Sequence, residues 1–187
     1  MAENPQTAKE IKEKGLFVIY TGEGKGKTTA AFGMVYRALG WGHKVSVIQF
    51  MKGKWKTGDR KFAEKLMETH ENFKFSVMGE GFTWESEDLN IDKAAAQAAW
   101  AKAKGLIQSG ELFLLVLDEI TYAIHFQFID LADVVETIKN RPSHLSMVLT
   151  GRQAPQELVE IADLVTEMKK IKHPFDQGIP AKPGVDF

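Results

Sequence analysis

The sequence of 187 residues contains no cysteine, which excludes a disulfide scaffold, a cysteine nucleophile and any metal site built on thiolates. It lacks a run of about 18 apolar residues, and residues 1–14 are polar and charged, without an apolar signal segment. We therefore expect a cytoplasmic protein that binds no membrane. The 24 basic residues are balanced by 25 acidic ones, and this near-zero net charge argues against nucleic acid as a partner.

The sequence contains apolar runs that alternate with helical patterns. Its length of 187 residues suits one domain. The expected strands are 16–20, 45–50, 73–77, 112–117, 146–150 and 164–166, and the expected helices are 27–39, 59–68, 92–108, 131–139 and 155–162. Strands that are apolar on both faces and alternate with helices predict an α/β fold, in which helices cover both faces of a mostly parallel sheet. We expect an N-terminal arm over 1–15, the α/β domain over 16–172, and an irregular tail of the same domain over 173–187.

A glycine-rich segment between the first strand and the first helix carries the strongest functional signal. It consists of Gly22, Glu23, Gly24, Lys25, Gly26, Lys27, Thr28 and Thr29. The second half of the P-loop pattern is present, although Thr21 stands where the first glycine belongs. Such a loop binds phosphate through its N–H groups, while Lys27 supplies positive charge and the Thr28 hydroxyl can ligate Mg²⁺. The sequence thus predicts an ATP site in a P-loop NTPase of RecA-like shape.

Two further strand ends carry residues that suit the same site. Asp118 and Glu119 follow the most apolar run in the chain, where a metal-binding acid of P-loop proteins belongs. Arg152 follows the expected strand 146–150, where a guanidinium can reach phosphate oxygens. Because ligands bind at the carboxyl ends of parallel strands, we expect all three side chains near the loop. Which of the two acids contacts the metal stays open at this point.

An aromatic pair, Phe82 and Trp84, stands in a loop that begins Gly79-Glu80-Gly81. Two residues apart in an extended chain, the two rings would face the same side. Either they form a wall for a flat or apolar ligand, or they fill the edge of the core. The residues alone do not distinguish these alternatives.

Taken together, these motifs resemble the P-loop corrinoid adenosyltransferase family, which acts on cob(I)alamin or cobyrinic acid a,c-diamide. The matching segments are Gly22–Gly33, Gln49–Gly53, Gly79–Trp84, Val116–Tyr122, Thr150–Arg152, Lys172-His173 and Gly184–Phe187. The combination of GEGKGKTT with GEGFTW is specific. Two departures are Ile124–Phe128 after the acidic strand, and Gly58-Asp59 where many members have Gly-Glu.

The resemblance implies an enzyme that transfers the 5′-deoxyadenosyl group of ATP to cobalt(I) of a corrinoid and releases tripolyphosphate, with Mg²⁺ (or Mn²⁺) as cofactor. The loop would cradle the γ-phosphate end of ATP, Thr28 with Asp118 or Glu119 would hold the metal, and Lys27 would stabilise the leaving group. Phe82 and Trp84 would bind the corrinoid and displace its lower ligand, which eases reduction of Co(II). The resemblance also implies a homodimer and a reduced flavoprotein as electron donor.

Two other functions share part of this pattern. A small-molecule kinase, or another P-loop ATPase, would use the same loop and acids but transfer the γ-phosphoryl group and yield ADP. An ATP-dependent module that binds nucleic acid would need a steep dependence of affinity on salt, against which the balanced charge argues.

Overall fold

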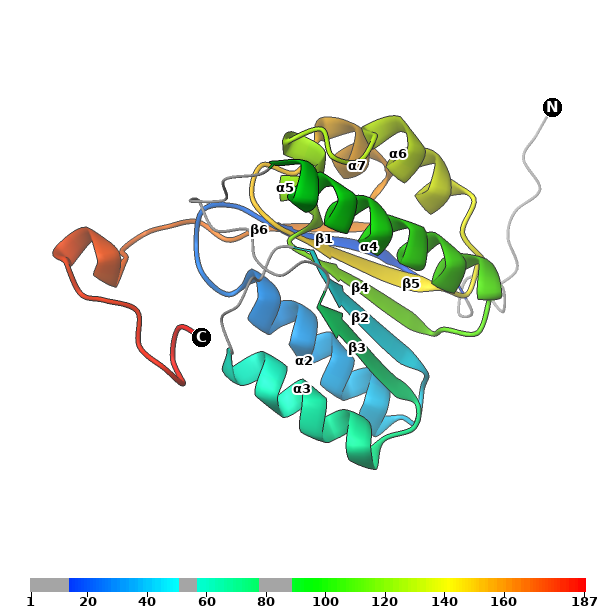
Figure 1. Ribbon diagram of the computed structural model, residues 1–187, viewed down its shortest axis with the longest axis horizontal. Helices are drawn as coiled ribbons and strands as arrows, with labels where there is room; N and C mark the ends of the chain where they lie inside the picture. Colours follow the sequence, from blue (N-terminus) through cyan, green and yellow to red (C-terminus); the bar gives the residue numbers. More distant parts are fainter. Residues whose placement is uncertain (1–13, 51–56, 78–88) are drawn as a thin grey trace.

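The computed structural model describes residues 14–50, 57–77 and 89–187 (Figure 1). Its elements in chain order are β1 (Phe17–Thr21), α2 (Lys27–Gly40), β2 (Val45–Gln49), α3 (Gly58–Thr69), β3 (Phe73–Val77), α4 (Leu89–Ser109), β4 (Leu114–Asp118), α5 (Ile120–His125), α6 (Leu131–Lys139), β5 (Ser146–Thr150), α7 (Gln156–Ile161), β6 (Leu164–Glu167) and the 3₁₀ helix η1 (Pro174–Gln177). All six expected strands are present. The short helix α5 and the 3₁₀ helix η1 were not expected.

In the described residues the strands form one parallel sheet in the order β3-β2-β4-β5-β1-β6, which confirms the predicted α/β fold. The chain leaves β1, crosses over two strand positions through α2, and continues in β2. The carboxyl ends of β1, β4 and β5 therefore lie next to one another at one edge of the sheet. A site at this edge can combine residues that are far apart in the sequence.

Helices cover both faces of the sheet, as Figure 1 shows: α2 and α3 lie on one face, and α4 to α7 on the other. Each face has its own apolar core. On the first face, Phe32 and Val35 of α2 pack with Val47 and Phe73 of the sheet. On the second face, the small residues Ala96, Ala99 and Ala103 place α4 close to the strands. No helix in the described ranges has the length and apolar character that crossing a membrane would require.

Local capping fixes where several helices begin. The Thr57 side chain accepts a hydrogen bond from the N–H of Arg60 (3.3 Å) at the start of α3. The Asp130 side chain likewise accepts from Ala132 N (2.9 Å) at the start of α6. The helix α2 differs, because glycine rather than a capping side chain precedes it. Its first N–H groups are consequently left for the loop and for a ligand.

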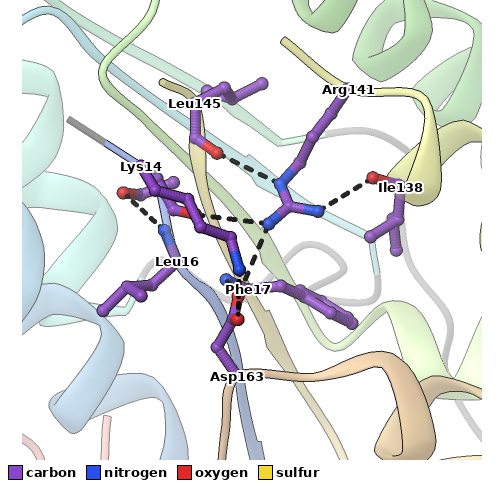
Figure 2. Close-up of polar contacts among 9 residues, drawn as sticks. Lys14, Leu16, Phe17, Ile138, Arg141, Leu145 and Asp163 are labelled. Carbon is purple, nitrogen blue, oxygen red and sulfur yellow. Dashed lines mark hydrogen bonds and ion pairs between the residues drawn. The ribbon is translucent and has the colours of Figure 1, made fainter. Parts of the chain in front are cut away.

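The amino end of β1, opposite the glycine-rich loop, is held by a polar cluster shown in Figure 2. The Arg141 guanidinium donates to the carbonyls of Ile138 (2.9 Å), Leu145 (3.2 Å) and Gly15 (3.3 Å). Asp163 accepts from the N–H of Phe17 (2.8 Å) and from Lys14 (2.9 Å). Burial alone would raise the pKa of Asp163, but these hydrogen bonds outweigh it and lower the pKa. The cluster fixes the start of β1 and hence the placement of the loop at its other end.

Candidate active site

The glycine-rich loop turns from β1 into α2 against the chain that follows β6. The N–H of Gly24 donates to the carbonyl of Met168 (2.6 Å), and Met168 N donates to Thr21 O (2.7 Å). Gly22 has φ 103°, and a Cβ there would lie 2.5 Å from the carbonyl oxygen of Met168. Glycine is required at this position for both reasons. The loop is therefore bounded on one side by backbone, and it leads directly into the N-terminus of α2, a position that favours anions.

Lys27, the first residue of α2, is folded over the loop. Its Nζ donates to the carbonyls of Gly22 and Gly24, each at 2.8 Å, and only 8% of the residue is exposed. Burial lowers the pKa of Lys27, and the nearby Glu119 carboxylate partly offsets this effect. The ammonium group is thus fixed at the centre of the loop. An anion that binds there would gain charge stabilisation in a largely desolvated place.

Asp118, the last residue of β4, is completely buried and lies behind the loop. Its carboxylate accepts hydrogen bonds from the hydroxyls of Thr28 (2.9 Å) and Thr150 (2.7 Å) and from the amide of Gln49 (2.9 Å). Gln49 is its register partner on β2, and Thr150 ends β5 on the other side. Asp118 therefore links the ends of three adjacent strands to the first turn of α2.

Glu119 has a different environment from its neighbour, because the backbone turns sharply after Asp118. Glu119 adopts the left-handed conformation (φ 60°, ψ 24°), and its N–H donates to Thr150 Oγ1 (2.9 Å). Glu119 is one of the residues that line the cleft in front of the loop, whereas Asp118 is not. One hydroxyl, that of Thr150, thus fixes both acids.

Two ion pairs lie at the rim of the cleft. Arg152 Nη1 lies 2.8 Å from an oxygen of Glu23, so the arginine predicted from the end of β5 does meet the loop. Lys25 Nζ lies 2.6 Å from Asp186, near the end of the chain. The hydrogen bond from Lys25, followed by that from the N–H of Lys182, lowers the pKa of Asp186. Each of these two cations therefore reaches the cleft already paired with a carboxylate that a polyphosphate would have to replace.

The cleft has a volume of 790 Å³, and most of the predicted site residues line it. These are Glu23, Gly24, Lys25, Gly26, Lys27, Thr28, Thr29, Glu119 and Arg152. Gly22 and Asp118 lie behind this surface and hold it in place. The expectations for Phe82 and Trp84 fall outside the described residues. The described part of the chain contains no cluster of three or more histidine or acidic residues that could hold a metal without other ligands.

Sequence reasoning missed two kinds of residue at this site. Gln49 and Thr150 were not selected, although each is a polar residue that ends an apolar parallel strand, which was a usable signal. The sequence predicts an irregular tail and no role for it in the site, but Phe175, Ile179 and Val185 line the cleft. These residues are harder to predict than Gln49 and Thr150, because nothing in a segment rich in proline and glycine indicates where in the fold the segment lies.

Comparison with known proteins gives consistent relatives. The family described as ATP:corrinoid adenosyltransferase BtuR/CobO/CobP matches residues 13–187. A corrinoid adenosyltransferase of Sinorhizobium sp is 47% identical over 181 residues, covering 96% of this chain and 84% of the relative. The corrinoid adenosyltransferase CobA of Salmonella typhimurium is 40% identical over 182 residues, covering 97% and 90%. That of Pseudomonas aeruginosa is 45% identical over 175 residues, covering 94% and 85%.

Among solved structures, the flagellar accessory protein FlaH from Methanocaldococcus jannaschii superposes with a TM-score of 0.50 at 13% identity. The match covers 82% of this chain and 71% of FlaH. At this identity the likeness concerns the fold alone, and it agrees with the parallel α/β sheet described above. The curated relatives give no support to the kinase alternative.

Proposed function

Because the chain belongs to the ATP:corrinoid adenosyltransferase family BtuR/CobO/CobP, we propose that the cleft at the glycine-rich loop is where this corrinoid adenosyltransferase binds ATP. The observation that carries the proposal is the convergence of Lys27, Thr28 and Glu119 on one cleft, with Asp118 holding Thr28 from behind. The physiological acceptor would be a cobalt(I) corrinoid, either cobalamin or cobyrinic acid a,c-diamide.

The reaction explains why the protein needs no nucleophile of its own. Cobalt(I) of the substrate donates an electron pair to the 5′-carbon of ATP, and a cobalt–carbon bond forms. The bond from this carbon to the α-phosphate oxygen breaks, and tripolyphosphate leaves with the electron pair. The protein therefore contributes orientation of the two substrates and stabilisation of charge on the leaving group.

The loop residues would stabilise the leaving group. We assign the triphosphate to Gly22–Thr29, because Lys27 and the N-terminus of α2 lie there. The resemblance to the family further implies that the γ-phosphate end lies at the loop. Arg152 would add a second cation after a phosphate oxygen replaces Glu23 as its partner. Charge-assisted hydrogen bonds of this kind strengthen as negative charge develops on the phosphate oxygens, so they favour the transition state over the substrate.

The acids and Thr28 fit a magnesium ion. Mg²⁺ prefers oxygen ligands and is usually held by one or two carboxylates together with substrate phosphates, as this oxygen-only set would allow. We assign Thr28 and Glu119 as the groups that would contact Mg²⁺ (or Mn²⁺), and Asp118 as the residue that orients Thr28. When bound, the metal neutralises negative charge on the tripolyphosphate leaving group.

Replacing Glu119 by glutamine should weaken Mn²⁺ binding in the presence of tripolyphosphate by about tenfold, because a charged oxygen ligand becomes a neutral one. Binding can be followed by the electron paramagnetic resonance signal of free Mn²⁺, without any turnover. Glu111→Gln is the matched control, since Glu111 is exposed and precedes β4 at the opposite edge of the sheet. Equal Mn²⁺ affinity for Glu119→Gln and the unchanged protein would refute this assignment.

The corrinoid side of the site is proposed from the resemblance. Phe82 and Trp84 would displace the lower ligand of Co(II) and leave a four-coordinate centre that accepts an electron more readily. We further propose that the protein is a cytoplasmic homodimer whose N-terminal segment helps to cover an active site, and that a reduced flavoprotein supplies the electron.

Trp84→Ala should impair turnover from Co(II) more than turnover from chemically reduced Co(I), by at least about tenfold, which corresponds to roughly 59 mV in a one-electron equilibrium. The reason is that the displaced lower ligand matters for reduction and not for alkylation. Initial rates from both starting states measure the difference. Trp41→Ala is the control, because Trp41 is exposed at the far end of α2. Equal loss from both states would assign Trp84 to packing instead.

A further inference from the structure

The cleft that we assign to a polyphosphate carries more carboxylates than its ligand alone explains. Among the described residues that line it, the acidic ones are Glu23, Asp59, Glu119, Asp176 and Asp186, and the lysines and arginines are Lys25, Lys27, Arg152 and Lys170. A site for a highly charged anion would be expected to show an excess of positive charge. A magnesium ion would account for Glu119, but it leaves the other carboxylates without a task.

Two of these carboxylates hold cations at the rim of the phosphate site. Asp186 Oδ1 lies 2.6 Å from Lys25 Nζ, and Glu23 Oε2 lies 2.8 Å from Arg152 Nη1. The side chains of Lys25 and Arg152 are 48% and 51% exposed, so a ligand in the cleft can reach both. Lys27 differs from them, because backbone carbonyls of the loop, rather than a carboxylate, hold its ammonium group.

The chemistry of adenosyl transfer makes the product difficult to release. The bond that breaks joins the 5′-carbon to the α-phosphate oxygen, so all three phosphate groups stay with the leaving group. The contacts of the site with these groups are therefore retained after the reaction, and charge-assisted ones strengthen with the added negative charge. Tripolyphosphate would thus be held by the same cations that bind ATP. Turnover requires that this product be displaced.

We propose that Glu23 and Asp186 compete with tripolyphosphate for Arg152 and Lys25, and that they favour product release by pairing with these cations again. Each carboxylate belongs to the same chain and lies within reach of its cation, so it acts at a high effective concentration. Asp186 is held in place for this exchange by the N–H of Lys182, which donates to its other oxygen (2.8 Å). The proposal rests on the proposed function of the loop as a triphosphate site.

Glu23→Gln and Asp186→Asn should each lower the Kd for tripolyphosphate about three- to fivefold, as expected for the loss of a competing ion pair that is partly exposed. The inhibition constant of tripolyphosphate added to the reaction should fall by the same factor. Calorimetric titration with tripolyphosphate and Mg²⁺ measures the Kd without turnover.

Glu167→Gln is the matched control for loss of one negative charge near the loop. The Cγ of Glu167 lies 3.0 Å from the place that a Cβ on Gly22 would take. Glu167 pairs with Lys169 at 3.8 Å and does not line the cleft. Its substitution should therefore leave the Kd for tripolyphosphate unchanged.

Removing the cation tests the exchange itself. In a protein that carries Lys25→Ala, Asp186→Asn should no longer change the affinity for tripolyphosphate, because the carboxylate has no cation left to compete for. Glu23→Gln should likewise have no effect in a protein that carries Arg152→Ala. The two pairs are independent tests, since Glu23 lies in the loop and Asp186 in the tail.

Tighter binding by both variants that disappears when the cation is absent supports the proposal. An equal gain with Glu167→Gln, or a gain that persists without the cation, would show a general effect of charge and overturn it. Weaker binding or an unchanged Kd would also overturn it, because the carboxylates would then not compete with the product. Failure of the underlying triphosphate assignment is recognised separately, because Lys27→Ala would then leave tripolyphosphate binding unchanged.

Discussion

Replacing Lys27 by alanine should lower the rate of adenosyl transfer on the order of a thousandfold, whether the reaction starts from Co(II) or from chemically reduced Co(I). The ammonium group is held by the carbonyls of Gly22 and Gly24 in a desolvated position, where its charge acts at close range on the leaving tripolyphosphate. Water that enters in its place cannot supply the same charge. Single-turnover rates from both cobalt states measure the effect.

The two starting states make this prediction specific. Lys27 should matter equally for both, because it acts on the leaving group and not on reduction of cobalt. Lys93→Ala is the control for loss of one positive charge, since Lys93 is exposed on α4. A loss confined to turnover from Co(II) would contradict the assigned role and place Lys27 in the reduction step.

Asp118→Asn should have two effects, a loss of folding stability of about 2–4 kcal/mol and a loss of activity on the order of a hundredfold. The buried carboxylate accepts hydrogen bonds from two hydroxyls and one amide, whereas asparagine replaces one acceptor oxygen with a donor. Thr28 and Thr150 share one carboxylate oxygen and Gln49 bonds the other, so the amide group removes the acceptor either of Gln49 or of both threonines. Either loss disturbs the hydrogen-bonded array that orients Thr28. Urea denaturation measures the stability, and single-turnover assays measure the activity.

Glu119→Gln provides the contrast. Because Glu119 lines the cleft and its backbone is fixed by its own N–H to Thr150, the substitution should cost less stability than Asp118→Asn while it weakens metal binding. The neighbouring acids would thus separate into one that holds the fold of the site and one that serves the ligand. If Asp118→Asn left stability unchanged, this division of roles would be wrong.

The loop and the order of elements could be predicted because both depend on residues that are adjacent in the sequence. A strand, three closely spaced glycines, Lys27-Thr28 and a helical pattern follow each other directly, so local physics is sufficient. The division between Asp118 and Glu119 could not be predicted in the same way. Both end the same strand, and only the left-handed turn at Glu119 sends their side chains to different places.

The residues that complete the site are non-local in sequence. Gln49 meets Asp118 only because β2 and β4 become neighbours in register, and Thr150 meets it because β5 lies on the other side. The tail presents the same difficulty to a greater degree. Its proline and glycine content predicts an irregular segment and gives no sign of η1, and its position at the cleft depends on the Lys25–Asp186 pair and on Met168.

A reaction of the protein with ATP, Mg²⁺ and a chemically reduced corrinoid distinguishes transfer of the adenosyl group from transfer of a phosphoryl group. Loss of the Co(I) absorbance reports alkylation of cobalt, and phosphorus NMR identifies the phosphate product of the same reaction. We predict one tripolyphosphate released for each corrinoid adenosylated. Formation of ADP, or consumption of ATP without alkylation of cobalt, would contradict the account.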